Sequence, residues 1–326
     1  MKKNIKILIT DPIHPDAVAQ LTEEGFEVVE LPEEKKEQLS ECIEPYHAII
    51  CRTSTVLDEP TLARAKNLSC IAIASTGWDR IDTEAATKRD ITVCGLPSHN
   101  KDIDPERDGN FVSTSEHAVL LILAALGDFY HAYQSMKEGR WEKKFLVGHE
   151  LAGKTVGLLG FGRIAGLVAR RLSGFRPRII AHDKFVSAEQ AKESGVELVS
   201  LDELCRQSDI ISIHLPKTPE TISMLGAKEF SLMREGVFIV NTARAAIMDE
   251  AALIENLKNG KVCRAALDVF HDEPTGLNWG LIRMPNVIAT PHIGGSTHEA
   301  WQRISLSAAN NVISFFRGEV KNKINL

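Results

Sequence analysis

The sequence has no hydrophobic segment long enough to cross a membrane. Its longest uninterrupted apolar run, "AVLLILAAL" at 118–126, has nine residues, whereas a membrane-spanning helix needs about 20. The opening "MKKNIKILIT" is interrupted by Lys6 and followed by Asp11, so its apolar part is too short for the core of a secretory signal peptide. We therefore expect a soluble, cytoplasmic protein without a membrane partner.

Cysteine pairs and clusters of basic residues are also missing. The six cysteines contain no Cys-x-x-Cys spacing, which argues against a disulfide framework and a thiolate zinc site. We expect them to be reduced and mostly buried, and we expect no metal. The net charge is −6 and the pI is near 6.0, with no basic block, so nucleic acid is not an expected partner. A small molecule is the better candidate.

Short β-branched runs alternate with polar, helix-like stretches along most of the chain. The first series comprises "IKILIT", "FEVVEL", "HAIICR", "CIAIAS" and "ITVCG", and a second series runs from "TVGLLG" to "NVIATP". This alternation predicts two α/β units, each with a parallel sheet. Between them, "SEHAVLLILAALGDFYHAYQSMKEG" continues through many turns without proline, and we expect one long helix there. Residues from Ser296 onward are expected to be helical.

One polar segment, "SHNKDIDPERDGNF" at 98–111, interrupts this alternation. It contains Pro105 and Gly109 and carries charges at most of its middle positions, so we expect a loop. Loops of this length in a compact domain are commonly functional or disordered. A solvated surface excursion is the simpler interpretation, and the sequence leaves both open.

A glycine-rich motif opens the second series. "VGLLGFGRIAGLVARRL" places Gly160-x-Gly162-x-x-Ala165 between an apolar strand and an amphipathic helix, which is the context of a dinucleotide-binding turn. Asp183 follows the next strand, about 20 residues downstream, where a carboxylate binds the ribose hydroxyls. Its charge would repel a 2′-phosphate, so NAD is favoured over NADP. In the alternative interpretation the glycines serve only packing and Asp183 is a surface residue.

Three polar residues follow strands of the second series. Arg244 comes after "VFIVN", Glu273 after "RAALDVF" and His292 after "NVIAT", so all three are expected beside the dinucleotide, outside the carboxyl ends of the strands. A protonated imidazole can neutralise the oxygen of a ketone that accepts a hydride, a carboxylate can orient that imidazole, and a guanidinium can hold a substrate carboxylate. Taken singly, His292 could be a loop histidine and Glu273 a solvated carboxylate. Together they predict a 2-keto acid and 2-hydroxy acid pair, with the stereochemistry open.

Several ordered segments resemble the signatures of the D-isomer-specific 2-hydroxyacid dehydrogenases, the family of D-3-phosphoglycerate dehydrogenase and hydroxypyruvate/glyoxylate reductases. These segments are "VGLLGFGRIA", "HLPKTPET", "VNTARAAIMDEAAL", "ALDVFHDEP", "NVIATPHIGGSTHEA" and, nearer the N-terminus, "STGWDRIDTEAATKRDITV". The resemblance covers nearly the whole chain. It implies an NAD-dependent enzyme whose catalytic trio is Arg244, Glu273 and His292.

The same resemblance implies which residues contact ligands. The implied cofactor contacts are Gly160, Gly162, Arg163, Ile164, Asp183, His214, Pro216, Thr242, Ala243, Asp268 and Gly295, with Asp268 facing the nicotinamide amide. Backbone around Thr76 and Gly77 would bind the substrate carboxylate, together with Arg244. Arg52, in "CRTST", resembles an arginine that approaches a substrate phosphate. Its alternative role is to pair with a nearby carboxylate.

The resemblance further implies the domain organisation. A flavodoxin-like substrate domain would comprise residues 1–112 and 296–326, a Rossmann NAD-binding domain residues 113–295, and two chains would form a homodimer through the nucleotide domains. We expect no C-terminal regulatory domain. The sequence departs from the family pattern at Ala165 and Ala245, where glycine is usual, and in about ten extra residues between "PSHN" and "STSEH".

Alternative functions remain open from the sequence. The same fold serves as an NAD(H)-sensing corepressor that performs no catalysis, although the intact Arg, Glu and His favour an enzyme. Formate oxidation is disfavoured because formate enzymes of this type resemble a pattern with glutamine at the position of Glu273, and phosphite oxidation is harder to exclude. Among 2-hydroxy acids, 3-phosphoglycerate and hydroxypyruvate or glyoxylate are the candidates, and the direction of flux stays open.

Overall fold

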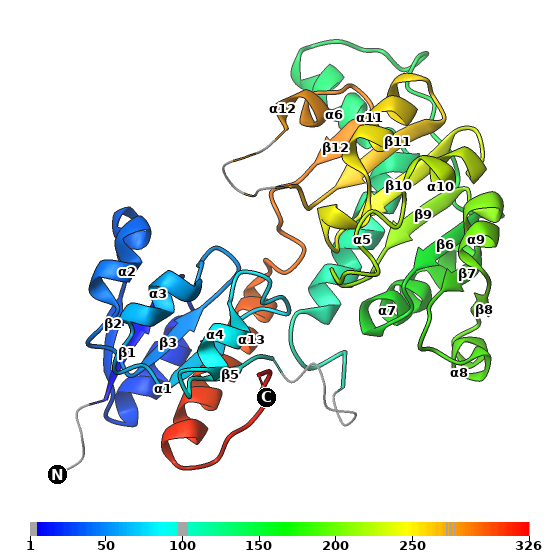
Figure 1. Cartoon of the computed structure of the whole chain (residues 1–326). Coiled ribbons are helices and arrows are strands. Elements are labelled where there is room, and N and C mark those ends of the chain that lie inside the picture. Colours follow the sequence, from blue (N-terminus) through cyan, green and yellow to red (C-terminus); the bar gives the residue numbers. More distant parts are fainter. Residues whose placement is uncertain (1–4, 97–103, 272, 274–275, 277, 326) are drawn as a thin grey trace. The chain divides into compact units, whose positions relative to one another are not determined.

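The computed structural model describes residues 5–96, 104–271, 273, 276 and 278–325. The chain divides into two compact units, called unit 1 (Met1–Val112 with Gly295–Leu326) and unit 2 (Ser113–Gly294). Each unit is an α/β structure built on one parallel sheet (Figure 1). The division falls at the residue pairs 112/113 and 294/295, which places Gly295 in unit 1 rather than at the end of the nucleotide-binding segment.

Unit 1 contains a five-stranded parallel sheet in the order β2-β1-β3-β4-β5. The strands are β1 (Lys6–Ile9), β2 (Glu27–Glu30), β3 (Ala48–Cys51), β4 (Cys70–Ile73) and β5 (Thr92–Cys94). This is the doubly wound order of flavodoxin-like folds, so the predicted fold of this unit is confirmed. The alternation of side chains across the sheet sends Ile7 and Ile9 into one buried core and Leu8 into the other.

Helices cover both faces of this sheet. They are α1 (Pro15–Glu23), α2 (Leu39–Cys42), α3 (Glu59–Arg64), α4 (Thr83–Thr87) and α13 (His298–Phe316), with a 3-10 helix η1 (Glu33–Gln38). The C-terminal helix α13 packs against α1 and β4 and buries Ile304, Ala308 and Val312 in the core that holds Ile7. Helix α13 therefore covers part of the sheet that the first hundred residues form.

Unit 2 contains a seven-stranded parallel sheet in the order β12-β11-β10-β9-β6-β7-β8. The strands are β6 (Thr155–Leu159), β7 (Arg178–His182), β8 (Glu197–Leu198), β9 (Ile210–Ile213), β10 (Val237–Asn241), β11 (Val262–Leu267) and β12 (Val287–Ala289). The chain changes direction across the sheet between β6 and β9, and ligands of such folds bind outside the strand ends at this switch point. The predicted Rossmann-type sheet is confirmed, and β8 is a two-residue edge strand that the sequence pattern does not reveal.

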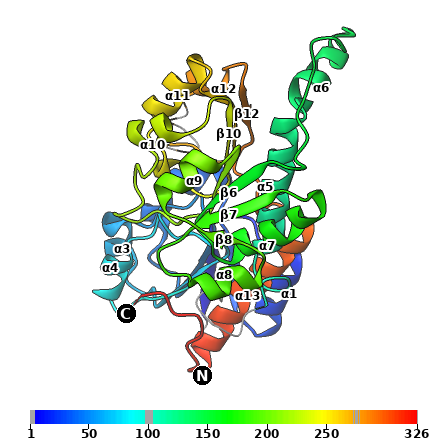
Figure 2. The same cartoon turned by 90° about the vertical axis from the view of Figure 1, so that its right-hand side faces the viewer.

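The helices of unit 2 flank its sheet. They are α5 (Phe111–Leu126), which begins at the unit boundary, α6 (Phe129–Lys137), α7 (Arg163–Leu172), α8 (Ala188–Glu193), α9 (Leu201–Gln207), α10 (Ala227–Leu232), α11 (Glu250–Lys258) and α12 (Trp279–Ile282), with 3-10 helices η2 (Ser173–Phe175) and η3 (Ala245–Ile247). Figure 2 shows α6 standing away from the sheet at the end of α5.

The prediction of one long helix after Ser115 is wrong, because the chain bends by 71° between α5 and α6. Asp128 occupies the bend in a left-handed conformation, with φ +54°. Its carboxylate accepts a bond from His131 at 2.5 Å and pairs with Arg264 of β11 at 2.8 Å. Arg264 also donates to the carbonyl of Ala125. An arginine from a distant strand thus stabilises the break, which no local pattern indicates.

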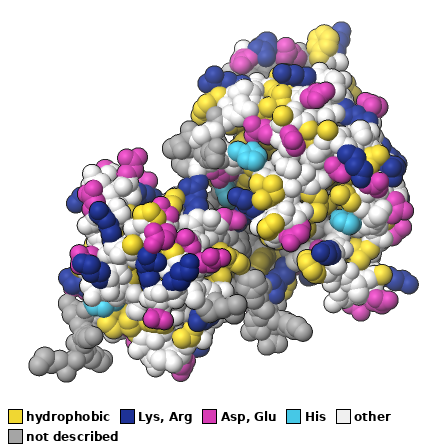
Figure 3. All heavy atoms as spheres, viewed as in Figure 1, with side chains coloured by type: hydrophobic (Ala, Val, Ile, Leu, Met, Phe, Trp, Pro, Cys, Tyr) yellow, Lys and Arg dark blue, Asp and Glu magenta, His cyan; other side chains and the backbone are white. Residues whose placement is uncertain are grey.

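Within the described ranges, no single helix is long and apolar enough to span a membrane. Helices α5 and α6 meet that criterion only as a bent pair. The six cysteines form no disulfide with one another in the structure, and Cys51, Cys70, Cys94 and Cys205 are buried, as expected for most of them. On the face drawn in Figure 3, Lys and Arg side chains are interspersed with Asp and Glu side chains. This mixture differs from the single-sign patch that marks a nucleic-acid surface.

The inserted segment is described only in part. Residues 97–103, which include the "SHNK" of the predicted loop, lie outside the described residues. From Asp104 the chain forms a turn in which the Asp104 N–H donates to the Asp108 carboxylate at 3.0 Å. Arg303 of α13 donates to the Gly109 carbonyl at 3.0 Å, so the end of the turn is fastened to unit 1.

Candidate functional site

The glycine-rich turn of unit 2 joins β6 to α7 in a geometry that requires glycine. Gly160 has φ +91°, and a Cβ there would lie 2.9 Å from Leu215 Cδ2 and 3.0 Å from the carbonyl carbon of His214. Gly162 precedes α7, has no side-chain cap, and a Cβ on it would meet no atom within 4 Å. The first glycine therefore packs the turn tightly, whereas the second leaves open space before the helix N-terminus, where backbone N–H groups attract anions.

Asp183 follows β7 and holds this turn. One of its carboxylate oxygens accepts the Phe161 N–H at 2.8 Å, and the other accepts the N–H groups of Phe185 and Val186 at 2.7 and 3.2 Å. An ionised carboxylate has about four acceptor sites, so Asp183 retains roughly one for a further donor. The residue predicted to bind ribose hydroxyls is thus also a structural link between the glycine turn and the next strand end.

His214 and Pro216 follow β9, on the other side of β6. The Nε2 atom of His214 and the Ser212 hydroxyl form a hydrogen bond of 2.9 Å, and the Pro216 carbonyl accepts the Thr221 hydroxyl at 2.7 Å. Desolvation by burial lowers the pKa of His214 to about 4, so the imidazole is neutral at pH 7. This histidine is suited to hydrogen bonding and packing rather than to binding an anion by charge.

The segment after β10 carries three of the predicted residues. Asn241 is fully buried, and its side-chain amide accepts the Ala243 N–H and donates to the Arg244 carbonyl, both at 2.9 Å. Arg244 in turn donates from Nη1 to the Ala243 carbonyl at 2.7 Å. The Thr242 hydroxyl is buried and has no hydrogen-bond partner among the described residues. A buried hydroxyl without a partner at a strand end marks a position where a ligand could supply the missing hydrogen bond.

Glu273 and His292 are in direct contact. The Nδ1 atom of His292 lies 2.6 Å from Glu273 Oε2, and the other carboxylate oxygen accepts the Phe270 N–H. Burial raises the pKa of the Glu273 carboxyl, but the hydrogen bond and charge of His292 and the Phe270 N–H lower it more, so the net pKa lies below the usual value. The carboxylate is therefore ionised at neutral pH and fixes the ring, leaving Nε2 as the atom not held by this pair.

A buried carboxylate shapes the loop that carries His292. Asp268 is 1% exposed and accepts four donors: the Thr290 hydroxyl at 2.6 Å, the N–H groups of Ile293 and Gly294 at 2.9 and 2.8 Å, and His117 Nε2 at 3.3 Å. Burial opposes ionisation, but these bonds outweigh it and lower the pKa of Asp268. Asp268 thus holds the chain on both sides of His292.

The backbone of His292 is strained. Its φ is +54°, a left-handed conformation that costs roughly 1–2 kcal/mol for a residue with a side chain. Because Asp268 binds Thr290 before it and Ile293 after it, the loop is held in this conformation. His117 of α5 completes the group through Asp268 and through Thr290, 3.1 Å away. His117 has no local signature in the sequence, because "STSEHAV" resembles any helix start.

Three predicted cofactor residues have less distinctive surroundings. Arg163 and Ile164 are the first residues of α7, both half-buried, and Ile164 packs against the core that contains Leu158. Gly295 belongs to unit 1, where a Cβ would lie 2.6 Å from the Asn110 side chain. The described contacts bring Glu273 and His292 together, and they leave Gly295 in another unit.

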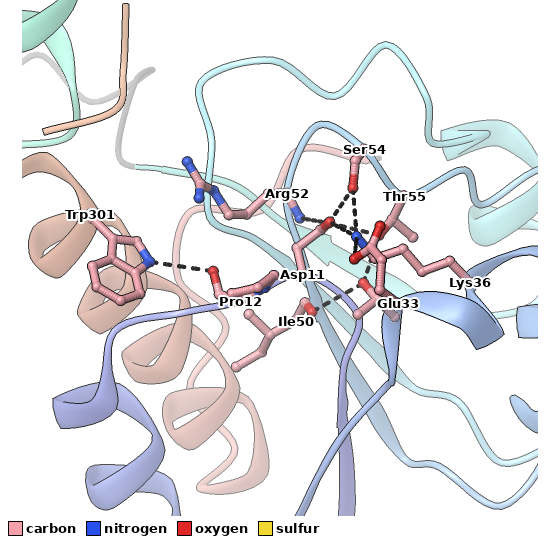
Figure 4. Close-up of polar contacts among 10 residues, drawn as sticks. Asp11, Pro12, Glu33, Lys36, Ile50, Arg52, Ser54, Thr55 and Trp301 are labelled. Carbon is pink, nitrogen blue, oxygen red and sulfur yellow. Dashed lines mark hydrogen bonds and ion pairs between the residues drawn. The ribbon is translucent and has the colours of Figure 1, made fainter. Parts of the chain in front are cut away.

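The substrate residues predicted from the sequence lie in unit 1. Arg52 follows β3, and its backbone N–H donates to Asp11 at 2.7 Å, while its guanidinium makes no hydrogen bond or ion pair within the described residues (Figure 4). Burial lowers the pKa of Arg52 and the charge of Asp11 opposes that shift. Thr76 and Gly77 follow β4, where the Ser75 hydroxyl donates to the Gly77 carbonyl at 2.7 Å. All three residues thus follow strands at the carboxyl edge of one parallel sheet.

The residues of unit 2 fit a dinucleotide. The open space at Gly162, the spare acceptor capacity of Asp183 and the orphaned Thr242 hydroxyl lie after β6, β7 and β10, at the carboxyl edge of one sheet. The catalytic candidates follow β10, β11 and β12 at that same edge. No group of three or more His, Cys, Asp or Glu side chains suited to a metal ion occurs in the part of the chain that the structure covers.

Comparison with known proteins identifies the family. The family model "D-isomer specific 2-hydroxyacid dehydrogenase, NAD binding domain" matches residues 119–294. D-3-phosphoglycerate dehydrogenase of Archaeoglobus fulgidus is 41% identical over 323 residues, which are 99% of this chain and 59% of that protein, so the chain spans about three-fifths of that relative's length.

Solved structures agree with this match. A glyoxylate reductase from Paecilomyes thermophila has a TM-score of 0.84 and 32% identity, with 99% of each chain covered. An NAD-dependent formate dehydrogenase from Staphylococcus aureus in complex with NAD has a TM-score of 0.86 and 29% identity, again with 99% of each chain covered. The chain therefore belongs to the D-isomer specific 2-hydroxyacid dehydrogenase family.

Proposed function

We propose that this protein is an NAD-dependent dehydrogenase that interconverts small 2-keto acids and D-2-hydroxy acids. The observation that carries the proposal is the 2.6 Å contact between His292 and an ionised Glu273, at the sheet edge that also bears the glycine turn. A histidine held by a carboxylate beside a dinucleotide turn is suited to moving one proton while a hydride moves.

In the proposed chemistry, NAD(H) supplies the hydride acceptor or donor. The Nε2 atom of His292 donates a proton to the carbonyl oxygen during reduction and accepts it during oxidation, while Glu273 stabilises the imidazolium. Arg244 binds the substrate carboxylate through its guanidinium, which fixes the carbonyl next to it. During reduction the imidazolium would thus lose its positive charge as the negative charge developing on the oxygen is neutralised, and oxidation would reverse both changes.

We assign cofactor binding chiefly to unit 2 and substrate binding chiefly to unit 1. Gly160 and Gly162 would admit the pyrophosphate, and Asp183 would accept a hydrogen bond from a ribose hydroxyl. The Thr242 hydroxyl would gain a hydrogen-bond partner from the cofactor. We assign further contacts to Arg163, Ile164, His214, Pro216, Ala243 and Gly295. Asp268 is proposed mainly to hold the His292 loop, because a nicotinamide amide would have to share or displace one of its four present donors.

For the substrate, a phosphorylated acid is the first candidate. Relatives that match 99% of this chain are named D-3-phosphoglycerate dehydrogenase, and the Arg52 guanidinium is partly desolvated without a partner in the described residues. Such a guanidinium is suited to a phosphate. We therefore propose 3-phosphoglycerate and its keto acid, with hydroxypyruvate or glyoxylate as the second candidate, since a glyoxylate reductase has the same fold.

A substrate panel tests this function. Purified protein is assayed with NADH and 3-phosphohydroxypyruvate, hydroxypyruvate or glyoxylate, and with NAD and the corresponding hydroxy acids. Arg52→Ala should raise KM for the phosphorylated acid about ten- to a hundredfold and leave glyoxylate kinetics nearly unchanged. Arg64→Ala, an exposed arginine of the same unit, is the matched control. Tight NADH binding without turnover of any acid would indicate a dinucleotide sensor instead.

We further propose that the protein is a cytoplasmic homodimer formed through unit 2. The bend after α5 exposes aromatic and apolar side chains over one stretch of chain, namely Phe129 (62% exposed), Tyr133 (54%), Met136 (57%), Trp141 (78%) and Phe145 (83%). Exposed aromatic clusters of this kind are typical of protein interfaces. Light scattering should give twice the chain mass, and Trp141→Asp with Phe145→Asp should give the monomer mass. A wild-type monomer would contradict the proposal.

A further inference from the structure

A buried carboxylate organises the loop that carries Arg52. Asp11 is 4% exposed and lies just after β1, separated from it by Thr10. One of its oxygens accepts the Arg52 N–H and the Thr55 hydroxyl, both at 2.7 Å, and the other accepts the Ser54 hydroxyl and Lys36 Nζ, the latter at 3.0 Å. Figure 4 shows the Arg52 side chain extending away from this group of contacts.

Lys36 is the cation that balances Asp11. Its ammonium lies 3.0 Å from Asp11 Oδ1, 3.2 Å from the Ser54 hydroxyl and 2.7 Å from the exposed Glu33. The Lys36 side chain is 21% exposed and the Asp11 side chain 5%, so water screens this pair less than an exposed ion pair. Asp11, Glu33, Lys36 and Arg52 together carry two negative and two positive charges, and the Glu33 side chain is 78% exposed, so water screens its charge more than that of the buried Asp11.

We propose that Lys36 is a specificity-determining residue which, without touching the substrate, cancels the charge of Asp11 and so preserves the attraction of Arg52 for an anion. This inference rests on the proposed role of Arg52. Asp11 is needed to hold the backbone of the 52–55 loop, yet its charge would weaken anion binding by the adjacent guanidinium. Lys36 allows the loop to keep the carboxylate without leaving an unbalanced buried negative charge near Arg52.

The hydrogen-bonding pattern provides a selective test. In Lys36→Met the Asp11 charge loses its balancing cation, whereas Lys36→Arg keeps it. In the double variant Lys36→Met/Asp11→Asn, the asparagine oxygen can still accept from Arg52 N–H and Thr55. Its amide can donate to the Ser54 hydroxyl, which is able to accept. The double variant therefore removes both charges and retains the loop bonds.

The experiment measures KM and kcat for 3-phosphoglycerate and for the hydroxy acid of glyoxylate at low and high salt. Lys36→Met should raise KM for 3-phosphoglycerate by about tenfold with kcat nearly unchanged, and the rise should shrink at high salt. Glycolate carries one charge instead of about three, so its KM should rise less. Lys36→Arg and the double variant should both return KM to within about threefold of wild type.

The change in KM from Lys36→Met to the double variant decides between a charge effect and a packing effect of Lys36. If Lys36 mattered only for packing, the second substitution would add damage, and a KM for Lys36→Met/Asp11→Asn above that of Lys36→Met would overturn the proposal. An unchanged KM in Lys36→Met would do the same. If Arg52→Ala itself left KM for 3-phosphoglycerate unchanged, the assignment of Arg52 would fail first, which distinguishes the two failures.

Discussion

The contact between Glu273 and His292 leads to a quantitative pH prediction for Glu273→Gln. Only an imidazolium can donate the proton during keto-acid reduction, so the reduction rate should fall along an alkaline limb. Opposite charges about 4 Å apart attract by about 1 kcal/mol in water and about 4 kcal/mol at an effective dielectric constant of 20. Because 33% of the His292 side chain and 23% of the Glu273 side chain are exposed, screening favours the lower part of this range, about 1–2 kcal/mol.

Removing this attraction should move the alkaline limb to lower pH, because the protonated ring loses the carboxylate that stabilises it. The rate should also fall at every pH, because a glutamine has a single oxygen for the two donors that Glu273 now accepts, His292 Nδ1–H and the Phe270 N–H. The pH at which the alkaline limb lies is therefore the specific test of the Glu273–His292 interaction, whereas the general loss of rate is not.

The assay is a kcat/KM profile for keto-acid reduction across the stable pH range. The control is the same substitution in a His292→Gln background, where no alkaline limb should remain for Glu273→Gln to move. An unmoved limb in the single variant would show that Glu273 does not stabilise the imidazolium. A limb that moves to higher pH would contradict the sign of the electrostatic argument.

Three further predictions follow from the same unit. His292→Gln should lower reduction about 10²- to 10⁴-fold with NADH affinity retained in a fluorescence titration; near-normal turnover would refute its role. Asp183→Ala should relax the preference for NADH over NADPH and weaken both, because the Phe161 N–H loses its acceptor; a wild-type enzyme that uses both equally would refute it. The pKa of Asp268 is lower in the folded protein than in the unfolded chain, where it is about 4. The ionised carboxylate therefore stabilises the fold above the unfolded pKa, and this contribution is lost as pH falls through the folded pKa. Asp268→Asn should therefore lower Tm at neutral pH and flatten its decline below about pH 4, and a parallel decline would contradict the sign.

Much of the site follows from local sequence because strand ends of a parallel sheet share one edge. Once "VFIVN", "RAALDVF" and "NVIAT" are identified as strands, the residues after them must lie at that edge. The contact of Glu273 with His292 agrees with this expectation. The glycine motif is equally local, because the positive φ of Gly160 and the close backbone of His214 exclude a side chain.

Other features depend on partners distant in sequence. The bend between α5 and α6 is stabilised by Arg264, more than a hundred residues away, so apolar periodicity predicted one helix where two exist. His117 became visible only through its contact with Asp268. The pairing of Asp11 with Lys36 and with the 52–55 loop likewise joins segments whose spacing has no local signature.

The sequence by itself determined the fold class, the order of the longer strands and the residue types at the strand ends, because these follow from hydrophobic periodicity and turn chemistry within a few residues. Tertiary structure decided the left-handed conformation of His292, the saturation of Asp268 with four donors and the neutralisation of Asp11 by Lys36. The physical reason is that a buried charge must find donors wherever packing places them, and packing joins residues that the chain separates.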